Sequence, residues 1–437
     1  MKRKLIIPLL LILLLTGCYS IDSYELYALP QRSKEYRELQ TAVEAALGNG
    51  SYSAPVSGAN RQVIQQMDLD GDGDEEILVF SKMEGERPLK LLILNREEDS
   101  FVHISTLEGD GTAFDSVQYA QLDGQPGLEI LLSRRIGEQV QQFLSVYTMN
   151  ADGPRELMSS GYAAYTLQDL DSDGRSDLIL LRNNADGLRA YAELYRCGGQ
   201  GDLVKEAEAS LSTAADSVKR ILIGNLAPEL PAVFVASAYD ESHLITDVFT
   251  LAQRGFVNIT LNAESGQSSQ TVRNYYVYST DIDNNGVIEL PDTQALPAIE
   301  GDSDSENQYR IIWYNLSPDG SRSDNKSTYH NFAEGWFLFL PEAWCQNLSV
   351  TRSHTDKGLA GTEFILSGED GSRRTLLKLY AFSGEKGPSL STEDGRFLIT
   401  QRGDVCYSAL LPEDSGLDPD ELRARFNFIS VDLLPES

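Results

Sequence analysis

Short apolar runs separated by polar turns occupy most of the chain after the first sixty residues. The earliest of them are Ile77–Phe80, Leu89–Leu94, Phe101–Ile104 and Ser116–Ala120, and Gly, Asp, Asn or Pro residues lie between them. Runs of this length, bounded by turn-forming residues, are typical of β-strands. Because helical periodicity is convincing only near Ser33–Leu47, the pattern predicts a mainly β fold.

One acidic turn recurs between these strands. It follows an apolar or aromatic strand, contains several acidic residues with a Gly, and ends in an acid before the next apolar run. Complete copies begin at Asp68, Asp169 and Asp281, and degenerate copies begin near Gln121 and Ile223. The copies start about 50 residues apart, and four short strands in each repeat are what one blade of a β-propeller requires. Residues 60–330 are therefore predicted to form a β-propeller of five to seven four-stranded blades.

The acidic loop and its period resemble the FG-GAP/VCBS repeats, a family that includes integrin-α-like propellers. The resemblance covers residues 60–315 and implies a propeller of that kind. The Phe-Gly and Gly-Ala-Pro segments that give the family its name are absent from this chain. Since five copies are visible in the sequence, the number of blades stays open between five and seven.

The three complete loops carry the chemistry of a calcium site. Oxygen-bearing side chains stand at loop positions 1, 3, 5 and 9, position 6 is Gly, and position 7 can offer its backbone carbonyl. Hard oxygen ligands without His or Cys favour calcium over zinc, so two or three calcium ions are predicted. The predicted metal ligands are Asp68, Asp70, Asp72, Asp74 and Glu76 in the first loop, Asp169, Asp171, Asp173, Arg175 and Asp177 in the second, and Asp281, Asp283, Asn285, Val287 and Glu289 in the third.

Two other interpretations of these loops stay open. An EF-hand would need a bidentate Glu at position 12, where Val79 and Leu180 stand in the first two loops. The third loop has Asp292 there, but Pro291 precedes it, which favours the propeller loop. A plain acidic β-turn without metal is the second alternative. The degenerate copies near Gln121 and Ile223 are expected to be structural turns that bind no metal.

The N-terminal segment has the pattern of an export signal. Residues 1–17 combine a basic start with the apolar run Leu5–Leu15, which is too short to span a bilayer as a stable helix. Leu15-Thr16-Gly17-Cys18 resembles the lipobox of bacterial lipoproteins, which implies cleavage before Cys18 and a diacylglycerol on its thiol. We therefore expect a lipid anchor in the bilayer on the extracytoplasmic face of the bacterial cell membrane, followed by a tether with a short helix at 18–59. An ordinary signal peptide is the alternative.

The repeat period is lost from about residue 331, and residues 331–437 are predicted to form a smaller α+β domain. Its opening, Gly335 to Trp344, is similar to the start of PsbP/Mog1-like domains. A helix is expected at Pro419–Phe426, with Asp418 and Glu421 as a capping box. Cys345 and Cys406 both fall in this region and could form a disulfide in an oxidising compartment, whereas free buried thiols are equally compatible with the sequence.

The net charge and the absence of common catalytic motifs limit the functions expected of the chain. The chain has 36 Lys and Arg against 66 Asp and Glu, a net charge of −30, so it repels phosphate backbones and a nucleic-acid partner is not expected. HExxH, GxSxG, P-loop and Rossmann motifs are absent, so we expect no catalytic residues and no enzyme activity. The expected role is a binding or scaffold module for an extracellular protein, peptide or glycan. A calcium-dependent extracellular hydrolase or lyase acting on polysaccharide or lipid is the alternative.

Overall fold

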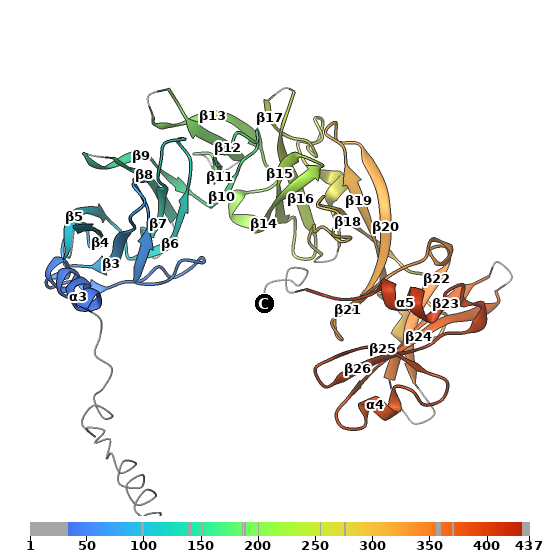
Figure 1. The fold of residues 1–437 in the computed structure, drawn as a ribbon. Helices are drawn as coiled ribbons and strands as arrows, with labels where there is room; N and C mark the ends of the chain where they lie inside the picture. Colours follow the sequence, from blue (N-terminus) through green and yellow to red (C-terminus); the bar gives the residue numbers. More distant parts are fainter. Residues whose placement is uncertain are drawn as a thin grey trace, which may run out of the picture. The chain divides into compact units, whose positions relative to one another are not determined.

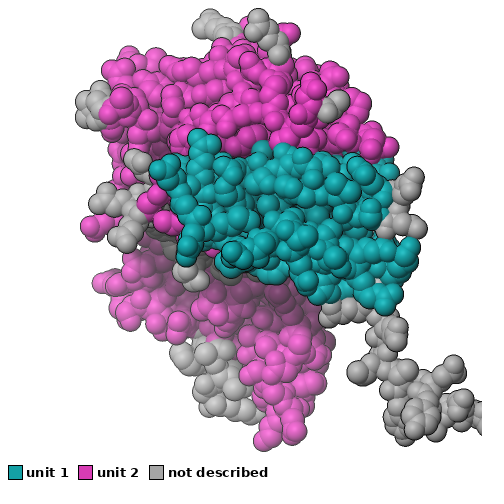
Figure 2. All heavy atoms as spheres, turned by 90° about the vertical axis from the view of Figure 1, so that its left-hand side faces the viewer, with its two compact units in different colours: residues 1–54, 62–68, 73–110 teal, residues 55–61, 69–72, 111–437 magenta. Residues whose placement is uncertain are grey.

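The computed structural model describes residues 34–430, apart from 98–99, 138–141, 151, 186, 188, 200, 254, 275–276, 355–359 and 369–370. The chain divides into two compact units (Figure 2). Unit 1 contains residues up to 54 together with 62–68 and 73–110, and unit 2 contains 55–61, 69–72 and the chain from 111 onward. The predicted leader and Cys18 lie outside the described residues.

Unit 1 is one sheet covered by a helix. The sheet has the order β1-β3-β4-β5, and β2 also pairs with β3. Val43 of the helix packs on Ile77, Val79, Leu92 and Leu94, so the apolar side of the helix closes the core of this unit. The elements are α3 (Lys34–Leu47), β1 (Ser51–Tyr52), β2 (Ile64–Met67), β3 (Glu76–Lys82), β4 (Leu89–Glu97) and β5 (Ser100–Gly109).

Unit 2 begins with three four-stranded antiparallel sheets in which sequence neighbours pair, the topology of a propeller blade (Figure 1). The first is β6 (Ala113–Ala120), β7 (Glu129–Arg135), β8 (Gln142–Asn150) and β9 (Gly153–Tyr162). The second is β10 (Ala164–Gln168), β11 (Asp177–Asn183), β12 (Ala190–Cys197) and β13 (Leu203–Ser210). The third is β14 (Val218–Ala227), β15 (Leu230–Ala238), β16 (Leu244–Ala252) and β17 (Gly255–Asn258).

Period-two alternation places the core between these sheets. On β11, Leu178 and Leu180 pack with residues of the preceding sheet, whereas Ile179 and Leu181 pack with residues of the following one. Successive side chains of a strand point to opposite faces, so a strand covered on both faces must be apolar throughout. This explains why β3 and β11, the strands after the first two complete loops, each contain a continuous apolar run. The prediction of a mainly β fold with blade-like sheets is confirmed.

Two five-stranded sheets complete unit 2. One has the order β18-β19-β20-β21-β27, with β18 (Leu290–Ala295), β19 (Tyr309–Leu316), β20 (Arg322–Asn331), β21 (Trp336–Phe339) and β27 (Phe426–Phe428). The other has the order β22-β23-β24-β26-β25, with β22 (Leu348–His354), β23 (Ala360–Ser367), β24 (Arg373–Ser383), β25 (Phe397–Arg402) and β26 (Val405–Leu410). The strand expected at the start of the C-terminal region is β21, which pairs with β20 on one side. On its other side β21 pairs with β27, which lies near the end of the described chain.

The C-terminal region also contains the helices α4 (Gly387–Leu390) and α5 (Pro419–Arg425). The Asp418 side chain accepts from the amides of Asp420 and Glu421, and the Glu421 side chain accepts from the Asp418 amide, so the expected capping box is formed. Of the helices that the structure describes, none is long and apolar enough to cross a membrane.

The disulfide considered between Cys345 and Cys406 is not formed, and both residues are free thiols. The Cys345 thiol donates to the Pro341 carbonyl at 3.4 Å. Cys406 is fully buried in β26, where it lies beside Gly387. Each sulfur is therefore accommodated by its own neighbours.

Candidate metal centres

Each complete acidic loop is held in a sharp turn by two left-handed backbone positions. They are Gly71 and Gly73 in the first loop, Ser172 and Gly174 in the second, and Asn284 and Gly286 in the third, all with φ between 58° and 93°. Position 6 is Gly as expected, whereas position 4 is Gly, Ser or Asn. Asn tolerates this region better than most side chains, and Gly adopts it freely. The loops lead into β3, β11 and β18 rather than into helices, so the EF-hand interpretation is wrong.

The carboxylate at position 1 organises the turn by accepting backbone amides. Asp169 Oδ1 and Oδ2 accept from the amides of Asp173 (3.1 Å) and Gly174 (2.8 Å). Asp281 accepts from the two matching amides of the third loop, at 2.9 and 2.7 Å. These bonds fold the loop around its own first residue, with the acidic side chains turned toward one another.

The acid at position 9 closes the base of each loop. Glu76, Asp177 and Glu289 are all buried. Asp177 accepts from the amide of Leu170 at 2.9 Å, and Glu289 accepts from the amide of Ile282 at 3.0 Å, so position 9 is tied to position 2 in both loops. A buried acid fixed in this way cannot turn to solvent.

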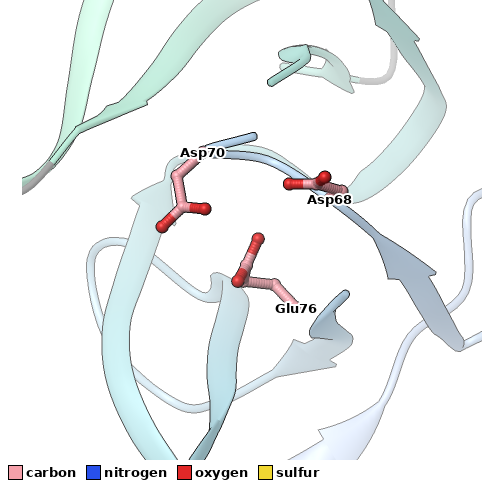
Figure 3. Close-up of side chains that lie close together, drawn as sticks. All are labelled: Asp68, Asp70 and Glu76. Carbon is pink, nitrogen blue, oxygen red and sulfur yellow. The ribbon is translucent and has the colours of Figure 1, made fainter. Parts of the chain in front are cut away.

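In each loop, the acids at positions 1, 3 and 9 converge. The three groups are Asp68, Asp70 and Glu76 (Figure 3), Asp169, Asp171 and Asp177, and Asp281, Asp283 and Glu289. Within each group, one ligand oxygen per residue lies within 4.8 Å of the others. Two oxygens that both bind calcium at 2.3–2.6 Å can lie no more than about 5 Å apart, so the spacing fits a shared ion.

The position 5 acids Asp72 and Asp173 do not belong to these converging groups. Asp173 turns to Arg175, which donates its backbone amide at 2.9 Å and its Nε at 2.8 Å. The Arg175 side chain lowers the pKa of Asp173. The ligand role predicted for position 5, and for the position 7 carbonyls of Asp74, Arg175 and Val287, stays a prediction.

The third group shows why a cation would be favourable. Burial raises the pKa of Glu289, while the Ile282 amide and the Asn315 side chain lower it, and the charges of Asp283 and Asp281 raise it again. Asp283 Oδ1 is buried and has no hydrogen-bond partner. An oxygen-only set of acids with a buried acceptor left unsatisfied fits a hard divalent cation.

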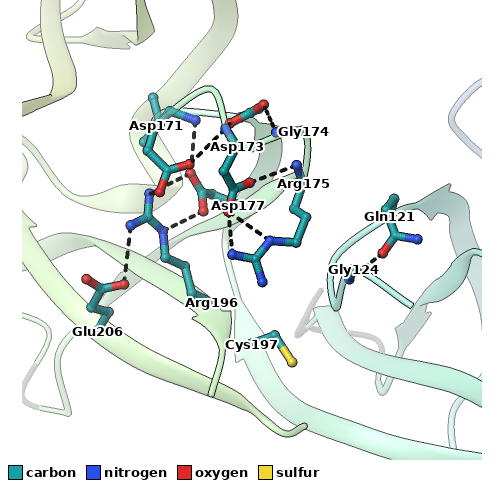
Figure 4. A network of polar contacts seen from close by, with 12 residues as sticks. Gln121, Gly124, Asp171, Asp173, Gly174, Arg175, Asp177, Arg196, Cys197 and Glu206 are labelled. Carbon is teal, nitrogen blue, oxygen red and sulfur yellow. Dashed lines mark hydrogen bonds and ion pairs between the residues drawn. The ribbon is translucent and has the colours of Figure 1, made fainter. Parts of the chain in front are cut away.

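An arginine from a neighbouring strand distinguishes the second loop (Figure 4). Arg196 of β12 contacts Asp177 at 2.6 Å and Asp171 at 3.2 Å, and its Nη1 lies 3.5 Å from Glu206. Its hydrogen bond to Asp177 raises the pKa of the Arg196 guanidinium. Two of the three converging acids in this loop are thus already paired with a positive charge.

The equivalent position beside the third loop is neutral. Asn315 of β19 donates to Glu289 at 3.1 Å, and Lys326 of β20 pairs instead with Asp283 at 2.7 Å. Arg196 and Asn315 were not predicted from the sequence, because each lies on the strand that pairs with the strand after its loop. The useful signal is the strand register: Tyr195 pairs with Leu178 and Tyr314 pairs with Leu290, so the next residue in each case lies beside the position 9 acid.

The degenerate copy at 121–129 keeps the loop frame without the full set of acids. It retains Glu129 at position 9, which is buried and accepts from the Leu122 amide at 2.6 Å, as in the complete loops. Thr148, on the following strand, donates to Glu129 at 3.1 Å. The copy near Ile223 is reduced to a tight turn at Pro228 and Glu229, between β14 and β15.

Gln121 holds this loop together through both ends of its side-chain amide. Its Oε1 accepts from the Gly124 amide at 2.7 Å, and its Nε2 donates to the carbonyls of Gly127, at 3.0 Å, and Gln125. Amide hydrogens directed at carbonyl oxygens supply the positive partner that a cation would supply in an acidic loop.

The loops of unit 2 also join neighbouring sheets. The position 8 amide of the second loop, Ser176, donates to the carbonyl of Gln121 at 2.8 Å. The position 8 amide of the third loop, Ile288, donates to the carbonyl of Asn225 at 2.8 Å, and the Asn225 side chain donates to Gly286 at 3.2 Å. A metal bound in one of these loops would therefore stabilise a contact between sheets as well as its own repeat.

No protein-family model matches the chain, and no curated protein matches it. Similar solved structures include the exotype rhamnogalacturonan lyase YesX, with 13% identity over 72% of this chain and 61% of that chain, at a TM-score of 0.26. A Bacillus licheniformis rhamnogalacturonan lyase matches with 12% identity over 72% and 77% of the two chains, at a TM-score of 0.30. An endo-arabinase from Bacteroides thetaiotaomicron matches with 9% identity over 75% and 96%, at 0.24. The match thus spans less than two thirds of the first of these chains, and similarities this distant assign no function.

Proposed function

We propose that the chain is a lipid-anchored bacterial lipoprotein, exposed outside the cytoplasm, whose calcium-stabilised β-sheets form a rigid binding or scaffold module. The observation that carries the proposal is the convergence of three acids in each of three loops. Ions in these loops would hold a frame together, and the surfaces of that frame would be free for recognition.

The electrostatics favour calcium in this role. Two carboxylates about 4 Å apart repel by about 4 kcal/mol at an effective dielectric of about 20. A bound divalent cation replaces that repulsion with attraction, and the all-oxygen ligand set selects calcium or a similarly hard ion. At a free concentration one hundred times Kd, one ion adds about 2.7 kcal/mol to the free energy of unfolding.

The loops support a structural rather than a catalytic role for these ions. In the second and third loops the position 9 acid is buried and bound to a backbone amide, so it is committed to the base of the loop. Rigid sheets with variable connecting segments suit recognition, because binding residues are then positioned by a fixed frame.

Limited proteolysis of the full chain, purified from membranes in detergent, tests the structural role. Calcium is expected to slow cleavage, because ordering the acidic loops reduces local opening. The matched sample contains chelator and magnesium. Cleavage at the same rate in both samples would contradict a calcium-stabilised frame.

Metabolic labelling with radioactive palmitate tests the anchor. The wild-type protein is expected to carry label and to sediment with membranes, and Cys18→Ser is expected to lose both properties. Cys197→Ser is the matched control, since Cys197 lies within the folded unit 2 and should leave the label unchanged. Labelling that survives Cys18→Ser would disprove the lipid attachment.

A further inference from the structure

A cavity of about 730 Å³ opens beside the third acidic loop, entirely within unit 2. Its walls come from β19, β20, β21, β27 and the end of α5, and the loop contributes Asp283 and Asn284. Cavities of about 300–1,000 Å³ are the usual size for small-molecule sites. The cavity is therefore large enough for a ligand of two or three rings.

Positive charge gathers in this cavity although the whole chain is strongly acidic. Three cationic side chains line it: Arg310, Lys326 and Arg425. Lys326 is paired with Asp283 at 2.7 Å. Arg310 and Arg425 form no ion pair with any residue that the structure describes, even though the chain has 66 acidic residues.

The acids of the cavity do not cancel these two guanidinium groups. Asp283 is held by Lys326, and Asp324 is held by Arg322 at 2.5 Å. Of the carboxylates in the described cavity wall, that leaves Glu342 without an ionic partner. Two uncompensated positive charges thus face one uncompensated negative charge, and the balance favours an anionic guest.

Arg310 is oriented by neutral groups that leave its charge available. It donates from Nη1 to the Cys345 carbonyl at 2.9 Å and from Nη2 to the Gln294 side chain, while its Nε is buried without a hydrogen-bond partner. A guanidinium fixed in place and separated from acids is suited to bidentate recognition of a carboxylate.

We propose that this cavity binds a small ligand carrying a carboxylate, held by Arg310 and Arg425. The amides of Asn325 and Asn427 and the hydroxyl of Ser327 offer hydrogen bonds to further polar groups, and Phe339 provides an apolar wall. The site deepens the proposed binding function by naming the chemical class of ligand. Two sources of such a carboxylate are an acidic sugar and an acidic peptide.

Isothermal titration of the full chain in detergent, in saturating calcium, tests the site with three probes. They are a disaccharide of hexuronic acids, the matching neutral disaccharide and an acidic tripeptide. At least one acidic probe is expected to bind, and the neutral disaccharide is expected to bind at least about tenfold more weakly, because it lacks the charged partner. The probe that binds identifies the source of the carboxylate.

Substitutions then locate the binding. Arg425→Gln and Arg310→Gln should each weaken the acidic probe by about tenfold, the loss of a charged hydrogen bond. Arg423→Gln is the matched control, since Arg423 lies on the same helix but bonds to Asp420 and to the Leu398 carbonyl. It should leave binding unchanged, and a melting curve of each variant confirms folding.

Binding that is unaffected by Arg425→Gln, equal binding of the neutral disaccharide, or binding of neither acidic probe would overturn the site. The last result, together with calcium-dependent melting, would disprove the cavity and leave the calcium-stabilised frame intact. Binding of an acidic probe without any calcium-dependent melting would support the cavity and disprove the frame.

Discussion

The loops at 121–129 and 281–289 form the same kind of turn with different side chains. Both tie a buried acid at position 9 to the amide of position 2, at 2.6 Å in one loop and 3.0 Å in the other. In the loop at 121–129, the side-chain amide of Gln121 donates to backbone carbonyls of the loop. In the loop at 281–289, three carboxylates converge instead. The acid at position 9 is thus common to both turns, and the residue at position 1 differs, being an amide in one loop and a carboxylate in the other.

The loop at 169–177 lies between these two. Its three acids converge as in the third loop, but Arg196 already compensates two of them. The loop at 121–129 is satisfied internally, and in the loop at 169–177 two of the three acids are paired with Arg196. In the loop at 281–289 one of the three acids, Asp283, is paired with Lys326, and the other oxygen of Asp283 is buried without a hydrogen-bond partner. We expect the dependence on calcium to increase in that order.

The largest effect should come from removing the position 9 carboxylate in the two contrasting loops. In excess calcium, Glu289→Gln should lower the free energy of unfolding by about 3 kcal/mol, because the third loop loses both a ligand and the linked ion. Glu129→Gln should cost about 1 kcal/mol or less, since only a hydrogen bond is changed. Denaturant unfolding in calcium measures both losses, and equal losses would show that the two loops do not differ in their dependence on calcium.

An intermediate effect on stability is expected from giving the loop at 121–129 a third acidic side chain. Gln121→Asp removes the amide hydrogens and gives acids at positions 1, 3 and 9, so in chelator it should destabilise the protein by about 2 kcal/mol. Added calcium should restore about half or more of that loss. Gln121→Ala is the control, because it lacks the new ligand and should not be rescued by calcium. Rescue of both variants to the same extent would contradict the interpretation of Gln121.

The smallest effect should come from the arginine of the second loop. Arg196→Gln removes a cation that competes with the ion, so calcium should bind the second loop about tenfold more tightly. Calcium titration by calorimetry measures the change in affinity. Arg189→Gln is the control, because Arg189 directly precedes β12, and it should leave the affinity unchanged. Weaker calcium binding in Arg196→Gln would show that the guanidinium supports the ion rather than replacing it.

Local patterns in the sequence predicted much of the fold. The continuous apolar runs identified the central strands, because neighbouring sheets cover both of their faces, as Leu178 to Leu181 show. The capping box at Asp418 followed from residues three positions apart. The acids at loop positions 1, 3 and 9 were predictable for the same reason, since one short turn brings them together.

Features that depend on distant segments were not predictable. Pairing of β27 with β21 joins strands about ninety residues apart, and no local period marks it. Arg196 acts on the second loop through the register of the following strand, which the loop motif does not specify. Cys345 and Cys406 share a region of sequence, but their separate environments became visible only in three dimensions.

Whether calcium stabilises the sheets can be measured by following calcium binding by the full chain together with its melting temperature. Equilibrium dialysis against calcium should find two or three ions per chain, and the melting midpoint should rise by several degrees between chelator and saturating calcium, since each ion stabilises by about 2–3 kcal/mol. A chain that binds no calcium, with the same midpoint in both solutions, would contradict the account.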